Sequence, residues 1–264
     1  MSKKIGLALG SGGSRGVAHI GVIKALEEEG IRPDYIVGCS MGAVVGAAYA
    51  NGLGVDEMFE IVSKLKAIQL IDLSAIPLTR LALLRGNKML NLLVNSIGET
   101  TFDQLKIPFR CIASDLYSGR LVTLSEGSVT QAVKASSSIP GVFPPVKLDG
   151  KLLVDGGVLC RVPTEQVKEM GADVVIAVDV LDNAKESVTE VKNMIALVIR
   201  IFDMMDHNRN EMQKTISGCK DEVWIVPEIK GMVQYAMKDF DRAYEEGYAA
   251  AKAKMQEIKE LIGQ

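Results

Sequence analysis

The sequence has few residues of the kinds that bind metal ions or cross-link a chain. It contains four cysteines and two histidines among 264 residues. The cysteines form no Cys-x-x-Cys pair, and neither His19 nor His207 lies beside one of them. Zinc sites and disulfide frameworks need such side chains at close and regular spacing. The sequence therefore indicates neither a metal site nor a disulfide-stabilised fold.

An excess of positive charge is also absent. The formal net charge is −3 at pH 7, so we expect no basic surface for nucleic acid. Residues 1–4 include two lysines, but the apolar run Ile5–Leu9 behind them is too short for the hydrophobic region of a secretory signal. We expect a cytoplasmic protein.

One uncharged stretch, residues 35–55, is long enough to raise the question of a membrane span. Small residues recur in it at every fourth position from Gly38 to Ala50, as they do where transmembrane helices pair. Its glycines, however, dilute the hydrophobicity. We interpret the stretch as a buried strand at 35–37 and a helix, Met41–Asn51, that lies close against a sheet.

With 48% hydrophobic and 24% charged residues, the chain can bury a large core, and we expect a single domain over residues 1–264. Apolar runs alternate with helix-forming segments. This alternation predicts an α/β protein, a three-layer α/β/α fold with a mostly parallel central sheet. The expected strands are 5–9, 35–37, 108–114, 121–124, 152–154, 174–180 and 222–226, and further helices are expected within 163–171, 187–218 and 238–261.

The most specific motif is Gly-Cys-Ser-Met-Gly at residues 38–42, directly after the apolar run 35–37. A serine between two glycines in a strand-to-helix turn is the pattern of a nucleophile elbow. The glycines let strand and helix approach closely enough to expose the serine hydroxyl. Ser40 is therefore a candidate nucleophile, although the five-residue pattern alone also occurs by chance.

A second glycine-rich turn, Gly-Ser-Gly-Gly-Ser-Arg-Gly at residues 10–16, would present backbone N–H groups to an anion. A dinucleotide fingerprint fits poorly, because Arg15 stands where its last glycine belongs and Ser40 where a ribose-binding acid belongs. A P-loop does not fit, because no lysine follows the last glycine. The third interpretation is an oxyanion hole, in which the amides of Gly12 and Gly13 bind the oxygen that becomes negative during acyl transfer.

An Asp-Gly-Gly turn that begins at Asp155 follows the apolar run 152–154. By itself such a sequence is more often only a turn. In the order glycine loop, elbow serine and Asp-Gly-Gly, the combination is far more specific. Asp155 is therefore a candidate base for Ser40.

With these motifs in this order, the chain resembles the patatin-like phospholipase family in its compact bacterial form. The resemblance covers at least residues 5–160 and includes residues 135–145, which look like the family's Ala-Ser-x-Ala-x-Pro-x-x-Phe-Pro-Pro segment. It implies a patatin-like fold. It also implies that Ser40 is the nucleophile and that Asp155 is its partner in a Ser-Asp dyad.

By the same resemblance, Gly12, Gly13 and Arg15 form the oxyanion loop. Ser11 stands where many members have glycine, and we expect its backbone N–H to remain available because a serine keeps that group. Arg15 has two interpretations. It adds positive charge to the loop or to a substrate phosphate, or it forms a structural ion pair.

The implied function is a serine hydrolase that cleaves carboxylic ester bonds of lipids, in the manner of a phospholipase A or lysophospholipase. It would act through an acyl-enzyme and without a metal or organic cofactor. One alternative is a Ser-His-Asp esterase of the α/β-hydrolase type, for which only His207 follows Asp155. Another is a catalytically silent lipid-binding or regulatory module. His19 is expected to be a packed helix residue.

Residues 58–93, rich in leucine and isoleucine, and residues 194–205 are candidates to cap the site and receive an acyl chain. The first is also a candidate for contact with a membrane surface, and ordinary packing is the alternative for both. Within 238–261, an apolar stripe at helical spacing predicts docking onto the core. The charged residues around Lys252 and Lys259 are expected to be a solvated surface.

Overall fold

The computed structural model describes residues 3–65, 98–181, 197, 200–201, 204–205, 221–229, 232 and 239–263. The strands are β1 (Ile5–Leu9), β2 (Tyr35–Gly38), β3 (Phe109–Asp115), β4 (Arg120–Leu124), β5 (Val146–Leu148), β6 (Lys151–Asp155), β7 (Val174–Val178) and β8 (Glu222–Ile225). The α-helices are α1 (Ala18–Glu28), α2 (Met41–Asn51), α3 (Val55–Leu65), α5 (Val129–Ser136), α6 (Thr164–Lys168), α8 (Phe240–Ala253) and α9 (Met255–Ile262).

The strands form one eight-stranded sheet in the order β5-β6-β3-β2-β1-β7-β8, with β4 also paired to β3. The part from β3 through β2, β1 and β7 to β8 is parallel. Strands β4 and β6 each pair with β3 in the antiparallel direction, and β5 pairs antiparallel with β6 at the edge of the sheet. The predicted α/β class is confirmed, and its sheet is mixed. Strand β5 was not predicted, because three residues with a central lysine give no clear strand signal.

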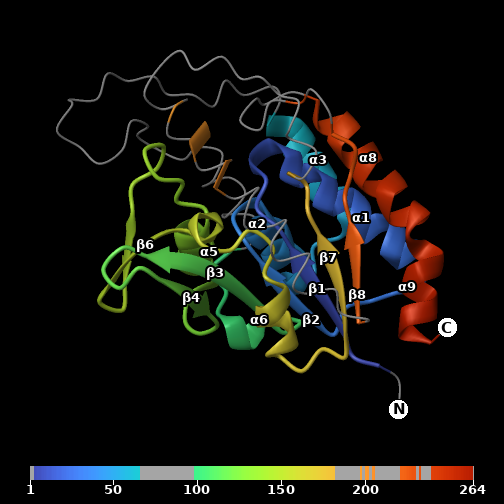
Figure 1. Ribbon diagram of the computed structural model, residues 1–264, viewed down its shortest axis with the longest axis horizontal. Helices are drawn as coiled ribbons and strands as arrows, with labels where there is room; N and C mark the ends of the chain where they lie inside the picture. The colour runs from blue at the N-terminus through green and yellow to red at the C-terminus, as the bar shows by residue number, and fades with distance from the viewer. Residues whose placement is uncertain are drawn as a thin grey trace.

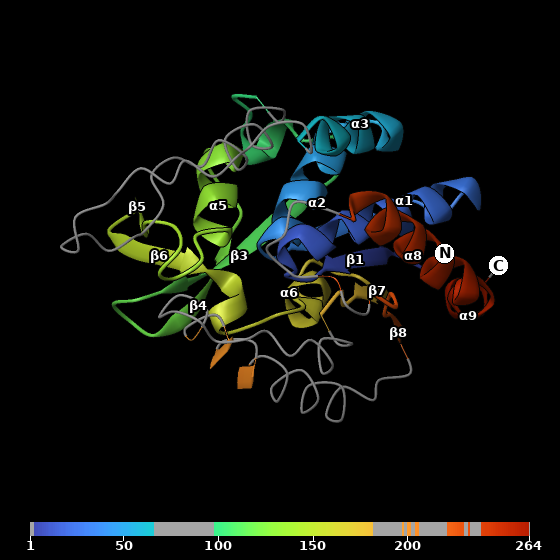
Figure 2. The ribbon, with the colours of Figure 1, turned by 90° about the horizontal axis from the view of Figure 1, so that it is seen from above.

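Helices cover both faces of the sheet, but not equally (Figures 1 and 2). One large core lies between the sheet and helices α1, α2, α3, α5, α8 and α9. A smaller core on the opposite face includes Val167 of α6. All five residues of β1 and of β7 are buried, which explains why these strands read as continuous apolar runs.

Helices α1 and α8 lie side by side and approach each other closely (Figure 1). A Cβ atom added at Gly21 would lie 2.0 Å from the carbonyl oxygen of Tyr244, and one added at Gly247 would lie 2.1 Å from that of Ala18. The obstacles are backbone atoms, which cannot turn aside as a side chain can. Only glycine at these two positions allows the observed packing.

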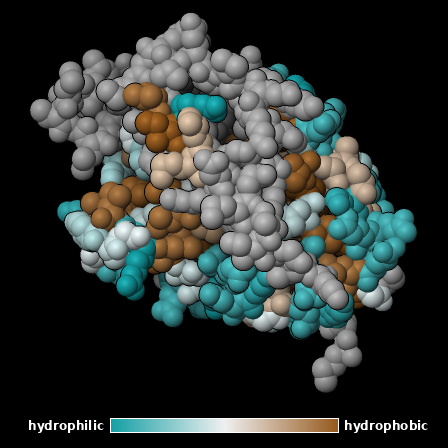
Figure 3. Space-filling model, viewed as in Figure 1, coloured by the Kyte–Doolittle hydropathy of each residue, from teal (hydrophilic) through white to brown (hydrophobic). Residues whose placement is uncertain are grey.

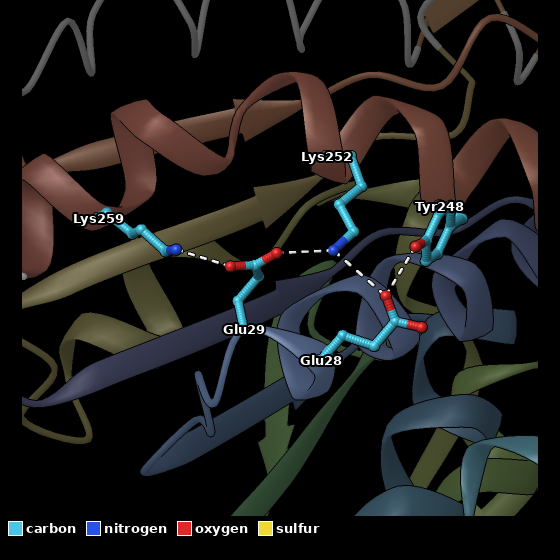
Figure 4. A network of polar contacts seen from close by, with 5 residues as sticks. All are labelled: Glu28, Glu29, Tyr248, Lys252 and Lys259. Carbon is cyan, nitrogen blue, oxygen red and sulfur yellow. Dashed lines mark hydrogen bonds and ion pairs between the residues drawn. The ribbon is translucent and has the colours of Figure 1, made fainter.

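A network of charged groups joins the C-terminal helices to the end of α1 (Figure 4). Glu29 accepts hydrogen bonds from Lys252 at 2.7 Å and from Lys259 at 2.6 Å, and these lysines lower the pKa of Glu29 to about 2. Tyr248 donates a hydrogen bond of 2.7 Å to Glu28, which also pairs with Lys252. Lys252 and Lys259 remain partly exposed, with side-chain exposed fractions of 31% and 38%, so the predicted solvated surface also carries ion pairs.

The remaining helix predictions have mixed outcomes. The apolar stripe docks onto the core as predicted, but the expected helix 238–261 is two helices that meet at Lys254, whose backbone is not helical. Residues 35–55 form β2 and α2, as interpreted from the sequence. Within the described parts of the chain, no helix has the length and apolar character needed to cross a membrane. Most of 187–218 lies outside the described residues.

Candidate active site

The candidate site lies where β1 and β2 end. These neighbouring parallel strands pair in register up to Leu9 and Gly38. The glycine loop follows β1 and Ser40 follows β2, so the two turns leave the same edge of the sheet. The position beyond the carboxyl ends of parallel strands is where ligands of such sheets commonly bind.

Ser40 occupies the sharp turn between β2 and α2. Its φ of 54° and ψ of −120° are unusual for a residue with a side chain, as expected at a strained elbow. A Cβ atom at Gly42 would lie 2.2 Å from the carbonyl oxygen of Leu9, so glycine is needed for α2 to pass so close to β1. Ser40 is also the N-cap of α2, which directs the positive end of the helix dipole toward it.

The structure brings Ser40 and Asp155 together, although they are far apart in the sequence. The side chain of Ser40 lies close enough to the carboxylate of Asp155 to lower the pKa of that group. Both side chains are buried, with exposed fractions of 5% and 6%. The Gly157 amide donates a hydrogen bond of 2.8 Å to Asp155 Oδ1. Asp155 ends β6, which pairs with β3, and this pairing carries the carboxylate to the elbow.

Burial raises the pKa of Asp155 from 3.8 to about 6, against the opposing effect of hydrogen bonds from Ser40, Gly157 and Cys39. Burial disfavours the charged carboxylate, while hydrogen bonds to it favour the charge. The group is thus an aspartate that holds a proton more readily than usual but is still ionised near neutral pH. A carboxylate with this pKa can accept a proton and return it.

Three consecutive serines hold the elbow and Asp155 in place. The Ser40 amide donates a hydrogen bond of 3.0 Å to Ser136 Oγ, and the Ser137 hydroxyl donates one of 3.3 Å to the Ser40 carbonyl oxygen. The Asp155 amide donates one of 2.9 Å to the carbonyl oxygen of Ser138. The sequence of segment 135–145 carries a family resemblance, but its pattern does not predict these contacts.

The backbone amides of the glycine loop are of two kinds: some donate hydrogen bonds within the protein, and others have no acceptor among the described residues. The Gly10 amide donates a hydrogen bond to the carbonyl of Val178, and the Ser11 amide donates one of 3.0 Å to that of Arg161. The expectation that the Ser11 amide remains available is therefore wrong. No described residue accepts a hydrogen bond from the amides of Gly12 or Gly13.

Gly12 and Gly13 each require the absence of a side chain. Gly13 has a φ of 53°, in the left-handed region. A Cβ atom on Gly12 would lie 2.2 Å from Cγ2 of Val180. The loop therefore presents two adjacent amides that have no acceptor in the described part of the chain, at the start of the short helix Gly13–Val17. Such successive N–H groups form a suitable site for an anion.

Arg15 is buried, and its guanidinium binds backbone. Its Nε donates a hydrogen bond of 2.9 Å to the carbonyl oxygen of Met232, and Nη2 donates to the same atom. The side chain is 3% exposed. Arg15 thus connects the glycine loop to a distant part of the chain, and its structural interpretation has direct contacts in support.

His19 packs inside the molecule, as predicted. Its Nε2 lies 2.8 Å from the carbonyl oxygen of Gly10, and burial lowers its pKa to about 4. A neutral imidazole ring donates a hydrogen bond from Nε2 to this carbonyl oxygen and so helps to hold the glycine loop. Asp179 forms a buried ion pair with Arg161 at 2.6 Å. His207 lies outside the described residues.

The candidate lipid-contact segments are described only in part. In residues 58–65, Met58 and Val62 are buried in the large core and two further apolar residues pack against it, while residues 66–93 lie outside the described residues. In the second segment, the described apolar side chains are exposed. No three His, Cys, Asp or Glu side chains of the described residues gather so as to hold a metal ion.

Two relatives of known sequence are similar to this chain. An NTE family protein of Mycobacterium bovis, itself uncharacterized, is 41% identical over 177 residues, which are 67% of this chain and 49% of the relative. Lysophospholipase nte1 of Aspergillus fumigatus is 30% identical over 289 aligned positions, covering 97% of this chain and 18% of the relative. The chain therefore spans about half or less of these relatives.

A solved structure supports the fold. VipD from Legionella pneumophila aligns with 97% of this chain and 67% of its own, at a TM-score of 0.52 and 13% sequence identity. Residues 7–168, which contain the glycine loop, the elbow and Asp155, match the family described as patatin-like phospholipase. This chain belongs to the patatin-like phospholipase family.

Proposed function

We propose that this protein is a serine hydrolase that cleaves carboxylic ester bonds of phospholipids or lysophospholipids through a Ser40–Asp155 dyad. The observation that carries the proposal is the close approach of the buried Ser40 side chain to a buried carboxylate, that of Asp155, whose pKa is raised to about 6. The name of the family and that of the relative Lysophospholipase nte1 support a lipid ester as the substrate class.

In the first half-reaction, Asp155 accepts the proton of Ser40 as Oγ attacks the ester carbonyl carbon. The tetrahedral intermediate then collapses, and the alcohol leaves with the proton that Asp155 returns. The acyl group stays on Ser40. In the second half-reaction, Asp155 takes a proton from water, which attacks the acyl carbon and releases the fatty acid, and Ser40 regains its proton.

The amides of Gly12 and Gly13 are the proposed oxyanion donors. They have no acceptor among the described residues, so an oxyanion would not compete with existing hydrogen bonds. A donor of this kind contributes about 3–4 kcal/mol to the transition state where one has been removed from another hydrolase. For Arg15 we propose a positioning role, because its guanidinium binds Met232 and can hold the loop.

Labelling with a fluorophosphonate, followed by assays on esters and lysophospholipids of increasing chain length, tests this function. We expect Ser40→Ala and Asp155→Asn each to abolish ester hydrolysis, and Ser40→Ala to abolish labelling as well. The matched controls are Ser125→Ala and Asp103→Asn, at exposed positions, which should keep full activity. Labelling that survives in Ser40→Ala would contradict the proposal.

A histidine test separates the dyad from a triad. If Asp155 is the base, His207→Ala and His19→Gln each keep most of the activity in a folded protein. A folded His207→Ala variant as inactive as Ser40→Ala would make His207 the general base.

A further inference from the structure

Large apolar side chains are exposed at two places outside the candidate active site. In the turn between β3 and β4, Leu116 is 52% exposed and Tyr117 69%. Among the helical residues described between 197 and 205, four are between 41% and 55% exposed, namely Leu197, Ile201, Met204 and Met205. Their spacing places them on one side of a helix. We call these six residues the apolar face.

In Figure 3, apolar residues lie over the end of the sheet that holds β3, β4 and β6 and at the described part of 197–205, with polar residues among them and further apolar groups elsewhere on the same face. Single exposed apolar residues are common on protein surfaces. Here, however, exposed apolar residues from two distant segments occur on the same side. An exposed apolar patch of this kind marks a surface for contact with another molecule or a membrane.

The turn that carries Leu116 and Tyr117 is held rigidly by Asp115. Asp115 Oδ1 accepts hydrogen bonds of 3.2 Å from the Tyr117 amide and from the Leu152 amide. Its Oδ2 accepts bonds from the amide and the hydroxyl of Ser118, the latter at 2.7 Å. The Leu116 amide in turn binds the Leu152 carbonyl. The two apolar side chains are thus presented to solvent by an ordered turn.

This turn projects from the edge of the sheet at which the candidate active site lies. Strand β3 is parallel to β2, whose end leads into Ser40. Asp155 pairs with Ala113 of β3, and Leu116 comes three residues after Ala113, directly behind the end of the strand. A surface that contacts Leu116 and Tyr117 would therefore face the sheet edge that carries Ser40 and Asp155.

Positive charge surrounds the same turn. On β4, Arg120 is the strand neighbour of Asp115 in the sheet. Two lysines lie nearby: Lys151 is the first residue of β6, and Lys147 lies opposite Leu152 on β5. None of these cations forms an ion pair with a described residue. The only acid in the neighbouring β5–β6 turn is Asp149. Unpaired cations beside an apolar turn suit anionic headgroups above an acyl layer.

We propose that the apolar face, together with Arg120, Lys147 and Lys151, docks this protein on the surface of an anionic phospholipid bilayer. The proposal rests on the proposed function, in which the substrate is a membrane lipid. A tyrosine beside a leucine is well suited to the bilayer interface, because its ring is apolar and its hydroxyl is polar. Docking would bring the edge of the sheet that holds Ser40 to the membrane.

Binding to vesicles tests the apolar part. Sedimentation with vesicles of phosphatidylcholine and phosphatidylglycerol is measured for the parent and for the double variant Leu116→Ser, Tyr117→Ser. Both side chains are exposed, so the variant should unfold at the same temperature as the parent. We expect its vesicle affinity to fall at least about tenfold. Its hydrolysis of a water-soluble short-chain ester should be unchanged.

The charged part has a matched control. Arg120→Gln with Lys147→Gln should lower affinity for vesicles that contain phosphatidylglycerol about tenfold or more, and change affinity for pure phosphatidylcholine little. Arg242→Gln with Lys254→Gln removes the same charge from the C-terminal helices, where Arg242 is exposed and Lys254 is partly exposed. This control should bind vesicles as the parent does.

Equal vesicle affinity of the parent and the Leu116→Ser, Tyr117→Ser variant would overturn the proposal, as would a parent that does not sediment with vesicles. If the parent is a dimer in sedimentation velocity and the variant a monomer with unchanged vesicle affinity, the face joins two copies of the chain instead. Failure of the proposed function has a separate sign, namely no Ser40-dependent hydrolysis of the soluble ester.

Discussion

Ser40 combines a strained backbone with a network that holds it. A positive φ in a residue with a side chain costs of order 1–3 kcal/mol and persists only where the surroundings impose it. Here Ser136 and Ser137 bind the amide and the carbonyl of Ser40, and Gly42 lets α2 lie against Leu9. These contacts hold the backbone of Ser40 in the turn that places its side chain near Asp155.

The raised pKa of Asp155 predicts the dependence of activity on pH. Because the proposed base must be ionised, kcat/KM for a soluble ester should increase with pH and level off above about pH 6. Below that value it should fall about tenfold for each pH unit. A pH–rate profile measures this, with circular dichroism to show that the protein stays folded. A profile without this rise would show that Asp155 is not the base.

The glycine loop predicts a second effect on turnover. Gly13→Val places a β-branched residue at a φ of 53° and displaces the amides proposed to bind the oxyanion. We expect kcat to fall at least about a hundredfold, since the loss of one such donor has that effect elsewhere. Steady-state kinetics on a short-chain ester measures this effect. The control is Gly54→Val, where an added Cβ meets nothing within 4 Å. Near-normal turnover of a folded Gly13→Val variant would show that the oxyanion is not bound by this loop.

Among the secondary-structure elements, the pair α1 and α8 is the most tightly constrained. Adding one methyl group in Gly21→Ala or Gly247→Ala forces it against a backbone carbonyl at about 2 Å, so the helices must move apart. Such overpacking typically costs about 1–3 kcal/mol of the free energy of unfolding. Urea denaturation measures the loss. Gly54→Ala, where a Cβ meets nothing within 4 Å, should change stability little, and equal stability of all three variants would contradict this packing.

The charged network beside these helices contributes less to the stability of the protein than their apolar packing does. Glu29 lies between Lys252 and Lys259, but its groups are in contact with solvent. Exposed ion pairs contribute little to stability and are screened by salt. The apolar packing of α8 and α9 against the core therefore provides most of the free energy that attaches these helices. The ion pairs help to fix the orientation of the helices relative to α1.

For the molecule as a whole, burial of the proposed catalytic carboxylate of Asp155 lowers the free energy of unfolding at neutral pH. Folding raises the pKa of Asp155 from 3.8 to about 6. The contribution of this carboxyl to the free energy of unfolding is therefore most favourable below about pH 4, and it is lost as the pH rises through about 6. At pH 8 this loss is of order 3 kcal/mol, from about two pKa units.

Asp155→Asn removes this titration. We expect the inactive variant to be more stable than the parent at pH 8, by about 1–3 kcal/mol, and the difference to shrink as the pH falls toward 4. Urea unfolding at both pH values measures it. Asp103→Asn, at an exposed position, should show no such difference, and a destabilised Asp155→Asn at pH 8 would show that burial does not dominate this carboxyl.

Much of the site could be predicted because its signals are local. Glycines at strained or crowded turns, an elbow serine after an apolar strand and an acid at a strand end can each be recognised within a few residues of sequence. The same holds for the alternation of strands and helices that predicted the α/β class. The single domain over residues 1–264 and the cytoplasmic location stay predictions.

The roles that depend on distant neighbours could not be predicted in this way. The use of the Ser11 amide by Arg161, the contacts of Ser136 and Ser137 with Ser40, and the pairing of Glu29 with two lysines all join residues far apart in the chain. The sequence by itself determined which residue types stand at the turns, because backbone sterics act locally. Only the tertiary structure decided which amides stay free, how far burial raises the pKa of Asp155 and which apolar residues remain exposed, because desolvation and hydrogen bonding depend on what the whole fold places around each group.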